Sequence, residues 1–177
     1  IGSNNDDNAY AQVRFNAQAN YHYWRLSWQR NQPFLNGWLW RLKARAQYSH
    51  QNLIGGEQFG LGGLHSVRGY DERAVNGDSG WLLSNEIRSS SFSFAKYFNV
   101  DVIDSLQWVM FADYGAVAVK SALPNQRKHT KIASIGPGFR YRIGNNLAIH
   151  FDYGFQLRAK RITEHKSKPH LQIRMNF

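Results

Sequence analysis

The feature that most restricts the fold of this 177-residue chain is an alternation of apolar and polar residues that recurs along nearly its whole length. Successive side chains of a β-strand point to opposite faces, so an alternation of period two predicts strands with one apolar and one polar face. No segment shows a helical period of comparable strength. We therefore predict an all-β fold with seven strands, at 11–28, 38–49, 81–88, 106–115, 133–143, 147–158 and 171–177.

Three further features favour a transmembrane antiparallel β-barrel over a soluble barrel or sandwich. Several of the expected strands reach the nine to eleven residues that cross a bilayer obliquely. The connections alternate between short and long, which is the asymmetry of outer-membrane barrels. Aromatic residues gather on the apolar face, whereas arginine, glutamine and histidine occupy the other face and suit a water-filled lumen. A soluble fold stays open as the alternative, because alternation alone does not say which face meets water.

The basic and aromatic composition raises nucleic-acid binding as an alternative of another class. Lys and Arg number 22 against 12 Asp and Glu, and aromatic residues make up 15% of the chain. Arg41, Lys43 and Arg45 share one strand face, and such a face could bind phosphates if it were exposed. Stacking platforms for bases, however, need aromatic residues on the same face as the basic ones, and here the two kinds lie on opposite faces. We therefore expect no nucleic-acid partner.

Signals for catalysis, metals or cofactors are weak. The absence of cysteine excludes thiolate metal sites and cysteine nucleophiles. Ser79 stands in a Gly-Asp-Ser-Gly element, but the cysteine and the second glycine of the serine-protease motif are missing. His150 with Asp152, or His165 with His170, could touch a metal, although solvated loop and lumen positions explain them better. We expect a protein that is not an enzyme and has no cofactor, metal or catalytic residue.

A glycine-rich stretch at 58–80 interrupts the alternation between the second and third expected strands. Glycine adopts backbone conformations that side chains forbid, so this stretch predicts a constrained loop carried by strands. Arg68 lies at its middle, between Val67 and Gly69. The glycines of the stretch are Gly60, Gly62, Gly63, Gly69, Gly77 and Gly80.

Three motifs and the chain end resemble one family. The motifs are the tetrad Val67, Arg68, Gly69 and Tyr70 (VRGY), the element 77–80 (GD.G), and the pair Phe111 and Asp113 (F.D). The chain ends in Phe177 after the alternating Ile173 and Met175. Together, over about residues 15–177, they resemble the two-partner secretion transporters (TpsB family) of the outer-membrane assembly and translocation barrel superfamily.

The resemblance implies a barrel of sixteen strands preceded by two POTRA domains. Residues 1–177 would then be a single barrel domain, a C-terminal fragment with about seven to eight strands, which could close as a small barrel of about eight strands. The alternatives are an eighth strand from the lead-in and another chain that completes the wall. The loop at about 52–78 would fold into the lumen, where Arg68 would pair with Asp113 and Glu86. Both carboxylates fall on the polar face by the alternation. The implied function is secretion of a partner polypeptide through the lumen, and assembly of outer-membrane proteins is the alternative within the superfamily.

The resemblance also implies a place and partners. The protein would lie in the bacterial outer membrane, in contact with its lipid and with the secreted polypeptide. The outer-membrane assembly machinery would read Ile173, Met175 and Phe177 as a C-terminal signal. A basic lumen should prefer anions. The residues expected to line it are Arg14, Arg41, Lys43, Arg45, Arg140, Arg142 and Arg158.

Overall fold

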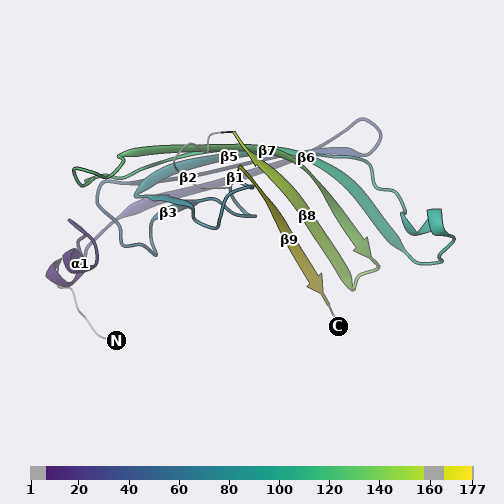
Figure 1. Ribbon diagram of the computed structural model, residues 1–177, viewed down its shortest axis with the longest axis horizontal. Helices are drawn as coiled ribbons and strands as arrows, with labels where there is room; N and C mark the ends of the chain where they lie inside the picture. Colours follow the sequence, from purple (N-terminus) through teal and green to yellow (C-terminus); the bar gives the residue numbers. More distant parts are fainter. Residues whose placement is uncertain (1–6, 158–165, 177) are drawn as a thin grey trace.

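The structure is a computed structural model that describes residues 7–157 and 166–176, and these form one curved antiparallel wall (Figure 1). The main sheet is 7-stranded, in the order β1-β2-β5-β6-β7-β8-β9. The predicted all-β class and the seven strands are therefore confirmed. The strands run over β1 Tyr23–Phe34, β2 Trp38–Ser49, β5 Ser79–Arg88, β6 Asp104–Ala118, β7 His129–Ile143, β8 Leu147–Gln156 and β9 Ser167–Met175.

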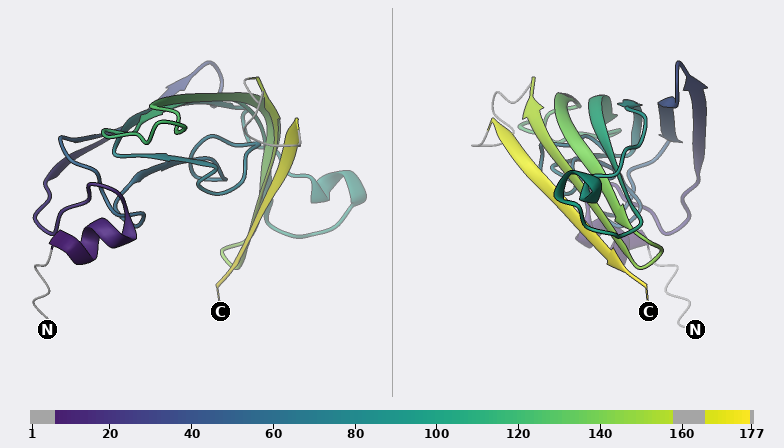
Figure 2. Two further views of the ribbon diagram at one scale, coloured as in Figure 1. Left: turned by 60° about the vertical axis from the view of Figure 1, so that its left-hand side comes forward. Right: turned by 90° about the vertical axis from the view of Figure 1, so that its right-hand side faces the viewer.

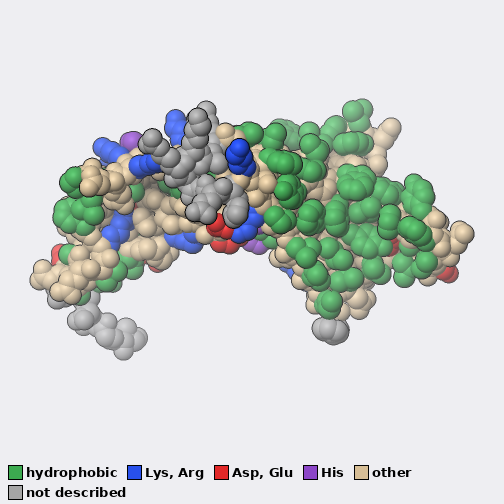
Figure 3. All heavy atoms as spheres, viewed as in Figure 1, with side chains coloured by type: hydrophobic (Ala, Val, Ile, Leu, Met, Phe, Trp, Pro, Cys, Tyr) green, Lys and Arg blue, Asp and Glu red, His purple; other side chains and the backbone are tan. Residues whose placement is uncertain are grey.

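The two faces of the wall differ as the alternation predicts. On β5, Trp81 and Leu83 are exposed on the convex face, whereas Glu86 is buried on the concave side. Figure 3 shows hydrophobic side chains covering much of the outer surface over the strands near the C-terminus. No helix in the described part of the chain is long and apolar enough to cross a membrane.

The connection between β2 and β5 lies in the hollow of the wall (Figure 2). It contains a 2-stranded sheet made of β3 (Phe59–Leu61) and β4 (Val75–Gly77). This connection packs on apolar residues of the concave face, so that part of the inner face is covered by a hydrophobic core. The core residues are Phe59, Leu61, Val67, Tyr70, Leu82, Val117 and Ile132.

The first expected strand is wrong over its first half. A short helix, α1 (Asp7–Val13), takes the place of strand at residue 11, and β1 begins only at Tyr23. Several apolar positions of that alternation are alanine, Ala11 within α1 among them, and alanine has the highest helix propensity. In the turn after α1, Asn16 has a φ of 58°, which is a left-handed conformation. The next connection is also shorter than expected, because β1 continues through Pro33 to Phe34.

The sheet does not close as a small barrel. Within the described residues β1 pairs only with β2 and β9 only with β8, so both remain edges. The lead-in supplies a helix and not an eighth strand from residue 7 onward.

The connections differ between the two ends of the wall. The turns 35–37 and 144–146 at one end are short, and the connections 50–78 and 119–128 at the other end are long. This asymmetry agrees with the alternation of short and long connections in the sequence. The exception is the connection 89–103, which lies at the short-turn end and contains the 3-10 helix η1 (Ala95–Phe98).

Candidate functional site

The VRGY segment approaches the concave face so closely that two glycines are required. Gly69 has a φ of +89°, and a Cβ there would lie 2.7 Å from the carbonyl oxygen of Gly154 on β8. A Cβ on Gly154 would in turn lie 2.5 Å from the backbone of Gly69. Tyr70, which is fully buried, donates its hydroxyl to the carbonyl of Ala133 at 3.1 Å. The loop is therefore seated on β7 and β8, with Arg68 beside the wall.

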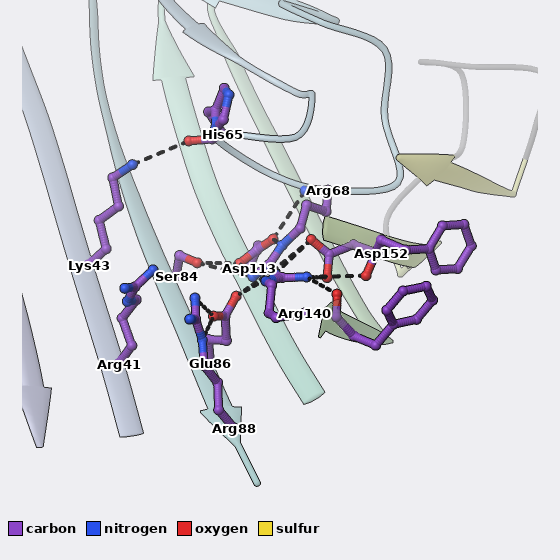
Figure 4. A network of polar contacts seen from close by, with 12 residues as sticks. Arg41, Lys43, His65, Arg68, Ser84, Glu86, Arg88, Asp113, Arg140 and Asp152 are labelled. Carbon is purple, nitrogen blue, oxygen red and sulfur yellow. Dashed lines mark hydrogen bonds and ion pairs between the residues drawn. The ribbon is translucent and has the colours of Figure 1, made fainter. Parts of the chain in front are cut away.

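Arg68 points into a ring of side chains from β5 and β6 (Figure 4). Its Nε and Nη2 donate to the two oxygens of Asp113 at 2.8 and 2.9 Å, which is a bidentate pair. Its Nη1 donates to Glu86 at 2.7 Å. Ser84 donates to Asp113 at 2.5 Å, and the guanidinium carbon lies 3.6 Å from the centre of the Phe111 ring. The structure thus brings together the three residues that the sequence singled out for this contact.

Three further residues, Asp152, Arg140 and Arg88, join these contacts, and sequence reasoning did not assign them there. Asp152 of β8 lies 3.5 Å from Nη1 of Arg68 and accepts two hydrogen bonds of 2.9 Å from Arg140 of β7. Arg140 also donates to Glu86 at 3.1 Å. Arg88 donates to the other oxygen of Glu86 at 2.6 Å. The alternation had placed Asp152 and Arg140 on the polar face, but only the strand order reveals their proximity to Arg68.

We call these residues the Arg68 cluster: Arg68, Glu86, Arg88, Asp113, Arg140 and Asp152. Its guanidiniums and carboxylates balance in number, which is what a buried ionic cluster requires. Burial lowers the pKa of Arg68, but the hydrogen bond to Asp113 and the negative charges of Asp113, Asp152 and Glu86 outweigh burial and raise this pKa above its ordinary value. The cluster therefore keeps a permanent cation between three strands of the wall.

A hollow of about 280 Å³ adjoins the cluster, and its lining is basic. Arg41 and Lys43 of β2 project into it beside the cluster (Figure 4). Among the described residues no carboxylate lies within ion-pair distance of either side chain. Arg45 shares their face and lies over the Phe59 ring, 5.8 Å from its centre. Arg142 shares the face of Arg140 on β7.

Of the expected lumen residues, Arg14 does not lie on this face, and Arg158 is not among the residues that the structure describes. Arg14 lies on no strand, because α1 precedes it and β1 begins at Tyr23, so the prediction that it projects inward from a strand is wrong. Arg158 lies outside the described residues, as does Phe177 of the expected C-terminal signal. Ile173 and Met175 of that signal are exposed on β9, 53% and 60%.

Arg14 instead contacts a buried carboxylate outside the Arg68 cluster, that of Asp78 in the GD.G element. Asp78 accepts from the backbone N–H of Leu53 and of Lys120, each at 2.8 Å, and from both terminal nitrogens of Arg14. Asn52 makes a similar link, because its side chain accepts from the N–H of Ser121 at 2.8 Å. We call Asp78 and its donors the Asp78 hub. It joins the connections 50–78 and 119–128 to the segment that precedes β1, and only the GD.G element in the sequence pointed to this position.

One family model and two relatives match the chain. The model for the haemolysin secretion/activation proteins ShlB/FhaC/HecB matches residues 1–141. The outer membrane transporter CdiB of Escherichia coli O6:K15:H31 (strain 536 / UPEC) is 36% identical over 83 residues, which are 47% of this chain and 14% of that protein. A second CdiB from Escherichia coli is 35% identical over the same share. The aligned region is therefore a small part of these relatives' length.

Solved structures share the fold, among them two of CdiB proteins. CdiB from Escherichia coli gives a TM-score of 0.73 at 23% identity, covering 88% of this chain and 27% of that chain. CdiB from Acinetobacter baumannii gives a TM-score of 0.64 at 24% identity with the same coverage. The curved wall thus has the fold of a portion of a larger transmembrane β-barrel.

Proposed function

Because the chain belongs to the ShlB/FhaC/HecB family of haemolysin secretion/activation proteins, we propose that it is part of an outer-membrane translocator that secretes a partner polypeptide through its barrel. Residues 1–177 then form part of a single barrel domain of a longer protein. The observation that supports this most directly is the Arg68 cluster, which fixes a long loop on the concave face of a wall whose convex face is apolar.

The Arg68 cluster, in this proposal, is the lock of the loop at about 52–78. The guanidinium of Arg68 meets carboxylates from β5, β6 and β8, so the loop is tied to three strands at one point. Either charge alone would be costly in this buried position, which opposes separation of the pair. The polypeptide would then pass a loop that keeps one position on the wall. A loop held in this way would not swing across the lumen and block it.

Lumen charge is the second part of the proposal. Arg41, Lys43, Arg45, Arg140 and Arg142 lie on the concave face, and the first two lack a carboxylate partner in the described part of the chain. Fixed cations lower the energy of anions in a pore. The full-length protein in planar bilayers should therefore prefer anions, as measured by the reversal potential in a KCl gradient.

A double variant tests this charge assignment. Replacing Arg41 and Lys43 by glutamine should shift the reversal potential toward cation permeation. Arg30→Gln is the matched control, because Arg30 pairs with Leu42 on the outer face of the same two strands. A cation preference of the unaltered protein, or an equal shift in the control, would contradict the assignment.

The proposal places the protein in the bacterial outer membrane, with lipid against the convex face. The apolar side chains there suit acyl chains, and among them Trp108 and Met110 are 57% and 61% exposed. Ile173 and Met175 of β9, together with Phe177 beyond the described residues, would be read by the outer-membrane assembly machinery during insertion.

The translocation itself is tested in the cells that carry the gene. Deleting the gene of the full-length protein should remove one large polypeptide from the culture medium, as measured by quantitative mass spectrometry, and its return on complementation is the control. Depletion of many outer-membrane proteins with an unchanged medium would instead support the assembly alternative. If the folded protein were extracted in buffer without detergent, that result would contradict both secretion and assembly and would favour a soluble protein that binds nucleic acid.

A further inference from the structure

The connection 89–103 between β5 and β6 differs from the other connections at its end of the wall. The neighbouring turns there, 35–37 and 144–146, are short, as is usual on that side of outer-membrane barrels. The connection 89–103 instead extends past the strand ends and contains η1 (Figure 1). Neither the proposed loop lock nor the proposed lumen charge involves this connection.

The extension has a fixed conformation made by its own hydrogen bonds. Phe92 and Leu106 form a β-bridge with backbone bonds of 3.0 and 2.8 Å. The carboxylate of Asp104 accepts from the N–H groups of Phe94 and Ala95 at 2.9 and 3.1 Å, at the start of η1. The backbone polar groups at the start of the extension are thus paired within the chain.

The apolar side chains of the extension nevertheless point away from the protein. Tyr97, Phe98 and Ile103 are 77%, 66% and 86% exposed. An aromatic side chain buries about 150–250 Å² when it is covered, so leaving these in water forgoes a large stabilisation. Contiguous apolar patches of this kind mark surfaces that bind something apolar. Phe94, Val100 and Val102 are exposed as well.

The patch continues into the outer face of the wall. Phe94 contacts Phe98 and Tyr141 of β7, with ring centres 5.3 and 6.2 Å apart. Ile103 accepts a backbone hydrogen bond of 2.7 Å from Gly144, which fixes the end of the extension to the neighbouring turn. The apolar surface at this end of Figure 3 shows no break between the strands and the extension.

The position of the extension limits what can cover it. β5 and β6 lie in the interior of the sheet order, so strands added at the edges β1 or β9 would not lie over this patch. Figure 2 (left) shows η1 on the side of the wall away from the loop in the hollow. The contents of the lumen therefore cannot cover it.

We propose that residues 93–103, named here the aromatic spur, insert into the membrane leaflet at the short-turn end and bind phospholipid at the boundary between acyl chains and head groups. This rests on the proposed function, which places lipid against the convex face. Phe98 and Ile103 enter the acyl region, and aromatic residues such as Tyr97 suit the interface. Lys96, which is exposed on η1, can extend its ammonium to lipid phosphate.

The test uses spin labels in the full-length protein in phosphatidylethanolamine and phosphatidylglycerol vesicles. The chain has no cysteine, so single variants can be labelled once any cysteine elsewhere in the protein is replaced. Phe98→Cys and Ile103→Cys should collide several-fold more with oxygen than with a water-soluble nickel chelate. Trp108→Cys on the convex face is the lipid control, and Asn145→Cys in the short turn 144–146 is the water control.

The controls separate failure of the spur from failure of the proposed function. If Trp108→Cys reports lipid while both spur labels resemble Asn145→Cys, the spur proposal is overturned and the membrane wall stands. Spur labels shielded from both reagents would mean that protein covers the patch, which also overturns it. If Trp108→Cys itself reports water, the membrane wall fails. Each variant is checked for folding by its resistance to detergent: a folded barrel stays folded in detergent until the sample is heated.

Discussion

The wall carries two buried arginine–carboxylate contacts that differ in construction. In the Arg68 cluster, carboxylates on three strands surround a guanidinium that is 5% exposed. In the Asp78 hub, a carboxylate from the loop base binds two backbone N–H groups and a guanidinium, that of Arg14, which is 17% exposed. The first joins a loop to rigid strands. The second joins connections to one another.

This difference separates two ways of ordering a long loop. Charged partners on strands lose little flexibility when they pair, because the strands already fix their positions. Backbone N–H groups of connections are ordered by the carboxylate itself, so the hub must also offset the entropy of ordering those connections. We therefore expect loss of the Arg68 cluster to cost more locally, and loss of the hub to affect more segments of the chain.

The largest effect is expected for Arg68→Ala. Asp113, whose side chain is fully buried, would keep Ser84 as a partner but lose its guanidinium, and breaking a buried pair in this way costs about 3–5 kcal/mol. Glu86 and Asp152 keep Arg140, so the wall itself should remain folded. The expected result is faster amide hydrogen exchange within 59–77, measured on the full-length protein in detergent.

Arg68→Lys sharpens the same test. A lysine ammonium keeps the charge but lacks the planar fork that meets both oxygens of Asp113, so an intermediate exchange rate is expected. Unchanged exchange at 59–77 in Arg68→Ala would show that the hydrophobic core under the loop, and not the cluster, holds it in place.

A smaller but wider effect is expected for Asp78→Ala. The N–H groups of Leu53 and Lys120 lose their acceptor, and leaving such buried groups unpaired costs about 1–3 kcal/mol. Faster exchange should spread over 14–22 and 119–128, while 59–77 changes less. Asp101→Asn, an exposed carboxylate at the other end of the wall, is the control. An equal increase in the exchange rate at 14–22, 119–128 and 59–77 would show that the hub and the cluster order the same segments.

The sequence could predict the wall and part of the Arg68 cluster because both depend on patterns that are local in the chain. Alternation fixes the face of every strand residue, so it places Asp113 and Glu86 on the concave side before any contact is known. The glycines around Arg68 indicate a constrained loop, and Gly69 indeed has a positive φ. These properties are local in the chain.

What the sequence could not predict depends on strand order and on connections. Asp152 and Arg140 meet because β7 and β8 pair, with Gly138 opposite Asp152, and this register follows from the turn 144–146. Asp78 binds Leu53 and Lys120 through their backbone, which has no residue signature. The helix α1 was missed because alternating alanine resembles a strand in pattern while favouring a helix in propensity.

The smallest effect is expected for Arg14→Gln, and it compares the two contacts directly. Arg14 is partly exposed, and Asp78 keeps its two backbone donors, so the loss should be about 1 kcal/mol. A double-mutant cycle on Arg14 and Asp78 should therefore give a smaller coupling energy than the same cycle on Arg68 and Asp113. Both couplings are measured from exchange at the affected segments. Equal couplings would mean that side-chain charge, and not attachment to strands, determines how firmly each loop is held.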